Sequence, residues 1–331
     1  MLLSLFPTGI IQDLDRLAPM GCPRISIVTP SLNQGRFLSA TLESVLGQGY
    51  PALEYLVMDG GSEDDSIELI RQRESELSFW RSGPDRGQAA AINEGFKRCS
   101  GAILGWLNSD DLYTPGTFSE VVRLLGQITD QPVVLYGGCE LFHDANRSRE
   151  VRPAIPFDGE LLQVTDYLDQ PSVFWTHAAW DLVGPLDESL HYAFDWDWFL
   201  RAAGSCKFIS SNKVLSRYRI HSEHKSGTGG GERWMELVEV VKRLAPDRIK
   251  DHYRYLTDHS MARWWLNKRM RFAQALAKVL PKNLANVVAT AASPPFWRVP
   301  SGIKSEVLWQ ISGIRCVARN SPATPKNSAP F

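Results

Sequence analysis

The sequence predicts an α/β fold whose core is a mostly parallel sheet flanked by helices. Strand-like and helix-like segments alternate through its first third, which is typical of βαβ units with right-handed crossovers. The run Ala102–Leu107 is apolar and predicts a buried strand. That strand is followed by the polar sequence Asn108-Ser109-Asp110-Asp111, at the edge where open α/β sheets bind their ligands.

The predicted elements follow one another in a regular order. Alternating or continuous apolar runs predict strands, and a period near 3.6 predicts helices. The predicted strands are 24–29, 53–58, 78–81, 102–107, 133–136 and 170–175. The predicted helices are 37–46, 66–77, 87–99, 195–203 and 232–244, followed by one or two helices over 248–280. The first four strands are each followed by polar residues, glycine or proline, so the strand ends carry most of the motifs.

Composition limits the class of protein. The 331 residues are enough for one large domain with an appendage, or for two domains, and 44% hydrophobic residues can fill a sizeable core. The net charge of -1 hides an asymmetry, because from Lys242 to the end 16 Lys and Arg stand against 4 Asp and Glu. Such a basic tail favours phosphate-bearing partners, either lipid headgroups or nucleic acid.

Cysteine usage and hydropathy indicate the compartment. The five cysteines stand singly without a CxxC pair, which predicts neither a zinc site nor a disulfide framework and fits a reducing cytoplasm. The apolar residues 1–11 lack the basic region and cleavage site of a signal peptide. No run of about 18 uncharged apolar residues occurs, so we expect no transmembrane helix. These observations predict a cytoplasmic protein, either free or peripheral at the inner face of the membrane.

Asp110 and Asp111 form the first candidate site. Two adjacent carboxylates repel each other, and a cation is the usual reason to keep them together. Carboxylate oxygens suit Mg2+ or Mn2+, which commonly bridge to substrate phosphates. An alternative fits this motif equally well when it is taken alone: Asp110 begins a turn, and Asp111 caps the helix that follows Pro115.

Three further motifs follow predicted strands, in the segments 28–33, 59–66 and 83–93. Carboxylates at such positions can bond to ribose hydroxyls or to a base edge, and glycines let the backbone approach a ring. Asp85 could reach a nucleotide, and Arg86 a phosphate. The structural alternatives are a tight turn at 59–61, a helix cap at Asp64 and a surface loop at Asp85 and Arg86.

Taken in order, these motifs resemble family 2 glycosyltransferases. The resemblance rests on Ser26–Asn33, Asp59–Asp64, Pro84–Gln88 and Gly105–Asp111, and it covers roughly residues 24–226. It implies a metal-dependent, hexosyltransferase-type enzyme with the Rossmann-like GT-A fold, a nucleotide-sugar donor with UDP favoured, an Mn2+ or Mg2+ ion, and inversion at the anomeric carbon. It also implies a carbohydrate or lipid-linked acceptor and a role in polysaccharide or other glycoconjugate assembly.

The resemblance further implies roles for individual donor-side residues. Asp59 corresponds to the nucleobase contact, Asp85 to the acid beside the base or ribose, Asp110 to the ribose-side acid and Asp111 to the carboxylate that holds the metal. His221, in an Arg-x-His segment, would reach the metal or the diphosphate, although a structural role is equally compatible with a single histidine. The other residues that the resemblance places at the nucleotide sugar are Pro30, Asn33, Arg86 and Asn93.

The segment Leu186–Trp198 resembles the acceptor segment of the family and implies the catalytic base. Many relatives read Glu-Asp-x-Asp there; Phe194 replaces the first acid, so Asp195 aligns with the base and Asp197 is the alternative. An inverting transfer needs one carboxylate to take the proton of the acceptor hydroxyl. Helix-dipole charges are the structural alternative for both acids. The resemblance places three more residues on the acceptor side, where core packing is the alternative for the two indoles: Gln170, Trp175 and Trp196.

The predicted organisation has four parts. They are an N-terminal extension (1–23), a GT-A catalytic domain (24–231), a basic helical extension (232–319) and a disordered tail (320–331). Within the catalytic domain, the nucleotide-sugar half covers about 24–115 and the acceptor half about 116–226. Basic and aromatic residues in 263–278 could form an interfacial helix on an anionic membrane, or a helix packed on the catalytic domain. No motif supports nucleic-acid binding.

Two other functions stay open. The missing acid at Phe194 leaves room for a non-catalytic nucleotide-sugar-binding or scaffold protein on the same fold. A nucleotidyltransferase would need a glycine-rich phosphate loop with a basic residue after the first strand, and Ser31–Arg36 matches that pattern poorly.

Overall fold

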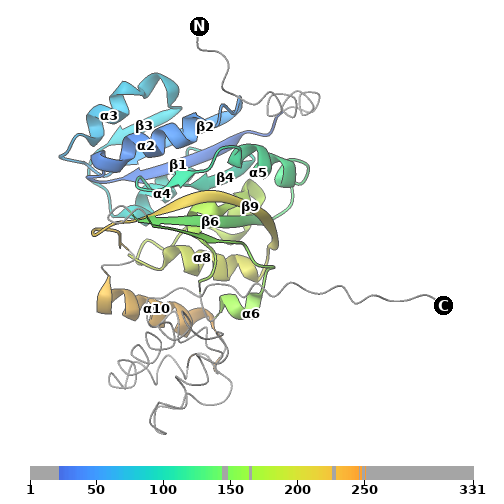
Figure 1. Cartoon of the computed structure of the whole chain (residues 1–331). Helices are drawn as coiled ribbons and strands as arrows, with labels where there is room; N and C mark the ends of the chain where they lie inside the picture. Colours follow the sequence, from blue (N-terminus) through green and yellow to red (C-terminus); the bar gives the residue numbers. More distant parts are fainter. Residues whose placement is uncertain are drawn as a thin grey trace.

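A nine-stranded mixed sheet runs through the described part of the chain (Figure 1). The computed structural model describes residues 22–143, 148–163, 166–225 and 229–245, with residues 247 and 250. The strand order is β3-β2-β1-β4-β8-β6-β9-β5, and β7 also pairs with β6. The strands are β1 (Ile25–Ser31), β2 (Leu53–Asp59), β3 (Phe79–Ser82), β4 (Ile103–Trp106), β5 (Leu112–Tyr113), β6 (Val133–His143), β7 (Arg149–Arg152), β8 (Val173–Thr176) and β9 (Lys207–Ile220).

The N-terminal half of the sheet is parallel, as predicted. β1 pairs in parallel with β2 and β4, and β2 pairs in parallel with β3. Helices α2 (Gly35–Leu46) and α3 (Ser66–Gln72) cover one face, and α4 (Gln88–Phe96) covers the other (Figure 1). The carboxyl ends of four strands therefore meet at one edge, which brings together the motifs that follow them.

Two hydrophobic cores lie on the two faces of this half of the sheet. β1 is buried along its whole length. Ile25 and Ile27 pack into the core with α2, whereas Val28 packs into the core with α4. Because successive side chains of a strand point to opposite faces, a nearly continuous apolar run is what a strand covered on both sides requires.

The C-terminal half of the sheet is mixed. β8 is antiparallel to β4 and β6, and β5 is antiparallel to β9, while β6 and β9 run parallel. The α/β class is thus confirmed, and the parallel pattern holds in the half from which it was predicted. β9 was missed by the sequence analysis, because Lys, Arg, Ser and Asn fill many of its positions and most of its side chains stay partly exposed.

The helix boundaries shift by a few residues from those predicted. The predicted helix 66–77 ends at Gln72 and is followed by a 3-10 turn, Glu74–Glu76. The predicted helix 87–99 is shorter at both ends. The other helices are α5 (Thr117–Leu125), α6 (Gly159–Leu162), α7 (His177–Val183), α8 (Phe194–Ala203) and α10 (Gly230–Leu244).

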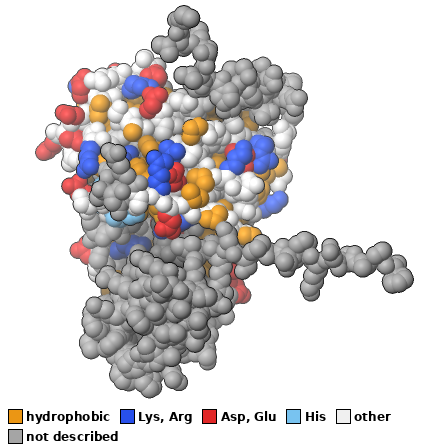
Figure 2. Space-filling view, viewed as in Figure 1, with side chains coloured by type: hydrophobic (Ala, Val, Ile, Leu, Met, Phe, Trp, Pro, Cys, Tyr) orange, Lys and Arg blue, Asp and Glu red, His pale blue; other side chains and the backbone are white. Residues whose placement is uncertain are grey.

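Some predictions fall on residues that the structure does not describe. They concern most of the N-terminal extension, the basic extension beyond α10, the interfacial helix within it, and the tail. None of the helices in the described ranges is long and apolar enough to cross a membrane. On the face shown in Figure 2, acidic and basic side chains of the described part are interspersed.

Candidate active site

A cavity of about 310 Å³ opens at the carboxyl ends of β1 and β4. Its walls come from the loops after β1, β3 and β4, from the turn at 170–171, and from the segment that leads into α8. Tyr218 of β9 and Lys225 complete the lining. The cavity occupies the position at which open α/β sheets bind their ligands.

The cavity brings together some of the predicted site residues and leaves others outside its lining. Those that line it are Pro30, Asp85, Asp110, Gln170 and Asp195. Those outside the lining are Asn33, Asp59, Arg86, Asn93, Asp111, Trp175, Trp196, Asp197 and His221. The cavity therefore joins two strand-end carboxylates to a carboxylate in the first turn of α8.

Asp59, at the end of β2, lies outside the cavity lining. Its side chain is fully buried. Its carboxylate accepts hydrogen bonds from the N–H groups of Gly61 and Ser62, at 3.0 and 2.9 Å, and from the hydroxyls of Ser62 and Ser82, at 2.5 and 2.6 Å. Three of these bonds end on Oδ2 and one on Oδ1. In this structure Asp59 holds the turn after β2 against β3, and its contact with a nucleobase stays a prediction.

Asn33 connects the loop after β1 to the loop after β2 and does not itself line the cavity. Its φ of +53° is a left-handed conformation that asparagine tolerates. Its amide oxygen accepts from the N–H of Glu63 at 2.9 Å, and its own N–H donates to the hydroxyl of Ser62 at 2.8 Å. These bonds fix the preceding residues 30–32, which do line the cavity.

Asp85 faces the cavity from the loop between β3 and α4. Its Oδ1 accepts from the N–H of Gly87 at 2.8 Å. Its Oδ2 lies so close to Gly60 that a Cβ at that position would be only 2.9 Å away. Glycine at position 60 therefore leaves room for Asp85 beside Leu32, and Asp85, Leu32 and Pro30 form one corner of the cavity.

Arg86 and Asn93, predicted to bind the nucleotide sugar, lie elsewhere. The side chain of Arg86 is 80% exposed and pairs with Glu188 at 2.7 Å. Asn93 is buried, donates to the carbonyl of Leu186 at 2.9 Å and accepts from its N–H at 3.0 Å. Both residues join α4 and its preceding loop to the segment that leads into α8.

Asp110 and Asp111 differ sharply in exposure. Asp111, the predicted metal ligand, is the more buried of the two. Asp110 lines the cavity. Asp111 is 1% exposed, and its carboxylate accepts from the N–H of Arg219 at 3.0 Å and from the amide of Asn108 at 3.4 Å. Burial and the adjacent Asp110 hold the pKa of Asp111 well above its ordinary value. Of the two carboxylates, Asp110 is therefore the one that a metal ion in the cavity could reach in this structure.

His221 lies beside Asp110. Its Nε2 is 3.1 Å from Oδ2 of Asp110, and its buried Nδ1 has no hydrogen-bond partner among the residues that the structure describes. Within the described ranges no three His, Cys, Asp or Glu side chains gather as a metal site. One carboxylate and one imidazole still fit a Mn2+ or Mg2+ ion that takes its other ligands from substrate oxygens and water, which is common for these ions.

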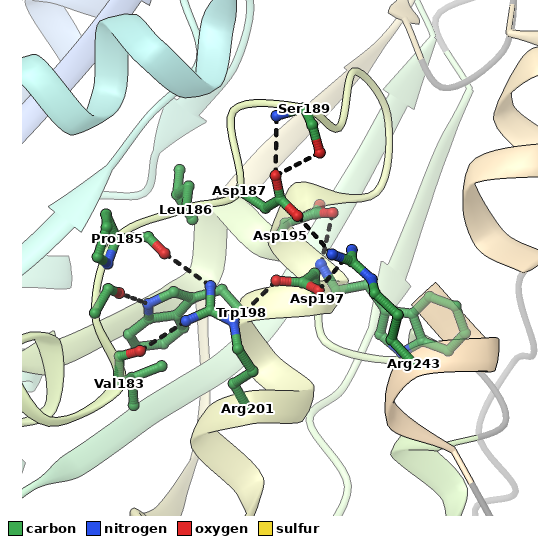
Figure 3. Close-up of polar contacts among 12 residues, drawn as sticks. Val183, Pro185, Leu186, Asp187, Ser189, Asp195, Asp197, Trp198, Arg201 and Arg243 are labelled. Atoms are coloured by element: carbon green, nitrogen blue, oxygen red, sulfur yellow. Dashed lines mark hydrogen bonds and ion pairs between the residues drawn. The ribbon is translucent and has the colours of Figure 1, made fainter. Parts of the chain in front are cut away.

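Asp195 and Asp197 lie in the first turn of α8 but have different surroundings (Figure 3). Asp195 lines the cavity and accepts from the N–H of Trp196 at 2.8 Å. Asp197 is 3% exposed and forms ion pairs with Arg201, at 2.9 Å, and with Arg243 of α10, at 3.2 Å. Asp195 is therefore the acid that a substrate in the cavity would meet, and Asp197 is a buried structural acid.

Trp175 and Trp196, predicted on the acceptor side, belong to the core. Trp175 is fully buried, and its ring centroid lies 5.4 Å from that of Trp106 and 4.7 Å from that of Trp198. Trp196 is 1% exposed and donates from its indole nitrogen to the carbonyl of Leu162 at 2.8 Å. The packing alternative is correct for both. Their residue types suit either role, so the sequence could not decide.

A chain of hydrogen-bonded side chains crosses the cavity lining. Lys225 donates to Oε1 of Gln88 at 2.8 Å, and Nε2 of Gln88 donates to Oδ1 of Asn108 at 2.8 Å. Nδ2 of Asn108 donates to Oε1 of Gln170 at 3.3 Å, and Nε2 of Gln170 donates to the carbonyl of Trp106 at 2.9 Å. Because an ammonium only donates and a carbonyl only accepts, the two ends fix the orientation of all three amides.

Lys225 is the single lysine or arginine among the described residues that line the cavity. Its ammonium lies 5.8 Å from the ring centroid of Tyr192 and 5.3 Å from that of Phe194. Burial lowers the pKa of Lys225 to about 8, although Asp195 and Glu236 act in the opposite direction.

Several lining residues had no predicted role, although most lie inside the motifs. Gln88 and Asn108 belong to two of the strand-end motifs, and His191 and Tyr192 belong to the acceptor segment. For these four residues, their position within a motif could have indicated a place in the site. No sequence signal pointed to Glu236 of α10, whose carboxylate accepts from backbone N–H groups more than forty residues away.

Comparisons with known proteins agree with this geometry. The sequence model described as "Glycosyl transferase family 2" matches residues 26–172. An uncharacterized glycosyltransferase of Mycobacterium tuberculosis, Rv1514c, is 30% identical over 203 residues, which cover 59% of this chain and 75% of the relative. The family match includes the loops after β1, β2, β3 and β4.

Solved structures with the same fold include S. aureus TarS 1-349 in complex with UDP-GlcNAc. It has a TM-score of 0.54 and 16% identity, over 81% of this chain and 79% of TarS 1-349. The mannosyltransferase PcManGT from Pyrobaculum calidifontis, solved with GDP-Man and Mn2+, has a TM-score of 0.53 and 20% identity, over 84% of this chain and 83% of PcManGT. At these identities the similarity shows the fold alone, and it confirms the predicted GT-A fold.

Proposed function

Because this chain belongs to glycosyl transferase family 2, we propose that it transfers a sugar from a nucleoside-diphosphate sugar to an acceptor hydroxyl with inversion at the anomeric carbon. The observation that carries this proposal is the single cavity lined by Asp85, Asp110 and Asp195. Two of these carboxylates follow parallel strands, where a nucleotide binds in α/β folds, and the third comes from the segment predicted to face the acceptor.

On the donor side, the corner formed by Asp85, Leu32 and Pro30 would hold the nucleoside. Asp85 lines the cavity, and its Oδ2 lies beside Gly60, which has no side chain of its own. A carboxylate at that place can accept from ribose hydroxyls or from a base N–H. UDP is the favoured nucleotide, since the family resemblance favours it and the fold neighbour TarS was solved with UDP-GlcNAc.

Asp110 and His221 would hold the metal ion, in place of the predicted Asp111. The fold neighbour PcManGT was solved with Mn2+, which supports Mn2+ or Mg2+ here. When bound, such an ion neutralises charge on the diphosphate and so makes it a better leaving group. Asp111 instead supports the strand-end loop, through its bonds to Arg219 and Asn108.

On the acceptor side, Asp195 would act as the general base. Its carboxylate accepts the proton of the attacking hydroxyl as the bond from the sugar to the diphosphate breaks. Phe194 takes the place of the first acid found in many relatives and lines the cavity next to Lys225. A single carboxylate therefore serves the proton transfer in this proposal. The acceptor is a carbohydrate or a lipid-linked molecule, in the assembly of a polysaccharide or other glycoconjugate at the inner face of the membrane.

The test is nucleoside diphosphate release from a panel of UDP-, dTDP- and GDP-sugars, with Mn2+, Mg2+ or EDTA. We expect release from one of them, and we expect EDTA to remove it. Absence of release, together with absence of thermal stabilisation by every nucleotide, would contradict the proposal. Stabilisation by a nucleotide without release, over a panel of acceptors, would favour a non-catalytic nucleotide-sugar-binding protein.

Lys225 would contact the donor phosphates, and replacing it by Met should lower UDP affinity by about tenfold. In the free protein burial lowers the pKa of Lys225 to about 8. A bound diphosphate favours the ammonium and raises that pKa, so binding above pH 8 takes up a proton. UDP itself titrates in this range in both proteins, so the quantity to compare is the ratio of wild-type to Lys225→Met affinity, which should be level below pH 8 and fall as the pH rises above it.

Calorimetric titration of UDP between pH 6.5 and 9.5 measures both effects. Lys213 is the control, because it lies in an exposed part of β9 and pairs with Glu120 at 3.0 Å, away from the cavity lining. Lys213→Met should bind UDP as the wild type does. Equal pH dependence in the wild type and in Lys225→Met would show that Lys225 does not contact the nucleotide.

A further inference from the structure

Glu236, in the middle of α10, caps the start of α8. Its Oε1 accepts from the N–H of His191 at 2.7 Å, and its Oε2 accepts from the N–H groups of Tyr192 and Ala193 at 2.6 and 3.1 Å. α8 begins at the next residue, Phe194, and Ala193 has no side chain that could cap it. Ala193 is the N-cap residue of α8, so its N–H is one of the donors that the start of a helix leaves without an intrahelical partner, whereas the N–H groups of His191 and Tyr192 belong to the turn before the helix. A carboxylate at this place also complements the positive end of the helix dipole.

The backbone that Glu236 holds carries one wall of the cavity. His191, Tyr192, Phe194 and Asp195 all line it, and they belong to five consecutive residues. A shift or rotation of this segment would move the carboxylate of Asp195, since only Phe194 separates it from the last capped residue. The donor-side lining residues, in contrast, come from the loops after β1, β3 and β4, and from Lys225, whose ammonium the charge of Glu236 favours.

α10 also holds this segment at its two outer ends (Figure 3). Arg243, two helical turns after Glu236, pairs with Asp187 at 2.7 Å and with Asp197 at 3.2 Å. These two aspartates flank the capped residues and Asp195 in the sequence. The same helix buries Trp234, Leu237, Val238 and Val241 in the core that contains Trp196 and Trp198, so α10 is itself fixed.

We propose that α10 is a positioning element of the active site, with Glu236 the positioning residue that sets the orientation of Asp195. This inference rests on the proposed function, because it concerns the base of that reaction. It extends the catalytic unit past residue 226, where the family resemblance ends, and well past the family match at residue 172. Glu236 acts through Asp195 and does not touch the substrate.

A double-mutant cycle with Asp195 tests the proposal, using the full chain. UDP-N-acetylglucosamine, or the nucleotide sugar that the panel selects in its place, serves as donor, and transfer rate and UDP affinity are measured separately. Glu236→Ala should lower kcat by roughly 30- to 100-fold, because small displacements of a reacting group have effects of that size. Measured at pH 6.5, where Lys225 keeps its charge, the Kd for UDP should stay within about threefold, because the loops after β1, β3 and β4 are untouched and Glu236 acts on the donor side through its charge near Lys225.

The decisive comparison is the same substitution in an Asp195→Asn background. If Glu236 acts through Asp195, then Glu236→Ala should change the residual rate of Asp195→Asn by less than about threefold. The control is Glu239→Gln, one turn along α10, where the side chain is 54% exposed and pairs with Lys242 at 3.7 Å. This control should match the wild type within about twofold in both rate and affinity.

Three results would overturn the proposal: wild-type kcat in Glu236→Ala, a parallel loss of UDP affinity, or equal losses with and without Asp195. If Glu236→Ala does not fold, Glu236→Gln replaces it, since the amide keeps the shape and one acceptor oxygen; we expect an intermediate loss of about tenfold. Failure of the proposed function would give a different result, since Asp195→Asn by itself would then transfer sugar as fast as the wild type.

Discussion

Asp195→Asn is expected to reduce sugar transfer by about 10³-fold or more, while the Kd for UDP stays within about twofold of the wild-type value. The reason is geometric. Asp195 is the acid of α8 that lines the cavity, and asparagine keeps its shape but cannot take a proton. Transfer kinetics at saturating donor, together with calorimetric titration of UDP, measure the two quantities independently.

Asp197→Asn is the matched control, two residues along the same helix. The carboxylate of Asp197 is 4% exposed and bridges Arg201 and Arg243, so its loss leaves two guanidinium groups partly unpaired. Because both arginines are partly exposed, we expect about 1–3 kcal/mol of lost unfolding free energy in urea and at most about a tenfold loss of kcat. Full stability with abolished transfer in Asp197→Asn would reverse the assignment of the base.

Asp110→Asn is expected to abolish the response of donor turnover to Mn2+ and to lower turnover by about 10²-fold or more. Asp110 lines the cavity and stands 3.1 Å from His221, so it is the carboxylate that can share an ion with this histidine. Turnover measured as a function of Mn2+ concentration gives both the affinity for the ion and the maximal rate.

Asp111→Asn should be far milder, with a loss of less than about tenfold. Burial and the neighbouring Asp110 already disfavour the charged form of Asp111 and raise its pKa, so a neutral side chain of the same shape fits the site. The amide can still accept from the N–H of Arg219. The prediction would be contradicted if Asp111→Asn no longer responded to Mn2+ while Asp110→Asn stayed active. That result would support the metal-binding role that the sequence resemblance implies for Asp111.

The sequence predicted the part of the site that depends on strand order. Parallel pairing of β1, β2, β3 and β4 brings the residues that follow these strands to one edge, so Pro30, Asp85 and Asp110 meet at the cavity as expected. The sheet edge and the βαβ order follow from apolar periodicity, which is a local property. The fold was therefore predictable over the half of the chain with the strongest periodicity.

The sequence did not predict which of two neighbouring polar residues faces the cavity. Asp110 and Asp111 differ by one position at a strand end, and their exposure depends on the loop geometry set by Asn108 and Arg219. Asp59 matches a site residue in type, yet the hydroxyls and N–H groups around it take up its oxygens. Such outcomes depend on contacts across the chain, which a linear pattern does not contain.

Long-range backbone contacts were equally inaccessible. Glu236 accepts from N–H groups of residues 191–193. Because a backbone N–H is present whatever the side chain, such a contact leaves no pattern in the sequence of residues 191–193. β9 escaped prediction for a related reason. Its pairing with β6 and β5 comes mainly from backbone hydrogen bonds, and its side chains, many of them polar, show no regular period.

The chain of amides from Lys225 to Trp106 has a consequence for recognition. The side-chain amide of an isolated glutamine or asparagine can rotate by a half-turn at little cost, which exchanges its oxygen and nitrogen. It can therefore bind either a hydrogen-bond donor or an acceptor at the same position. In this chain, a half-turn of any one of the three amides would place its N–H donors opposite another donor and its oxygen opposite another acceptor. The lining is thus preorganised before a sugar enters, and a ligand loses little rotational entropy in ordering it. Epimers that differ in the direction of a single hydroxyl would meet a surface that cannot adapt to them.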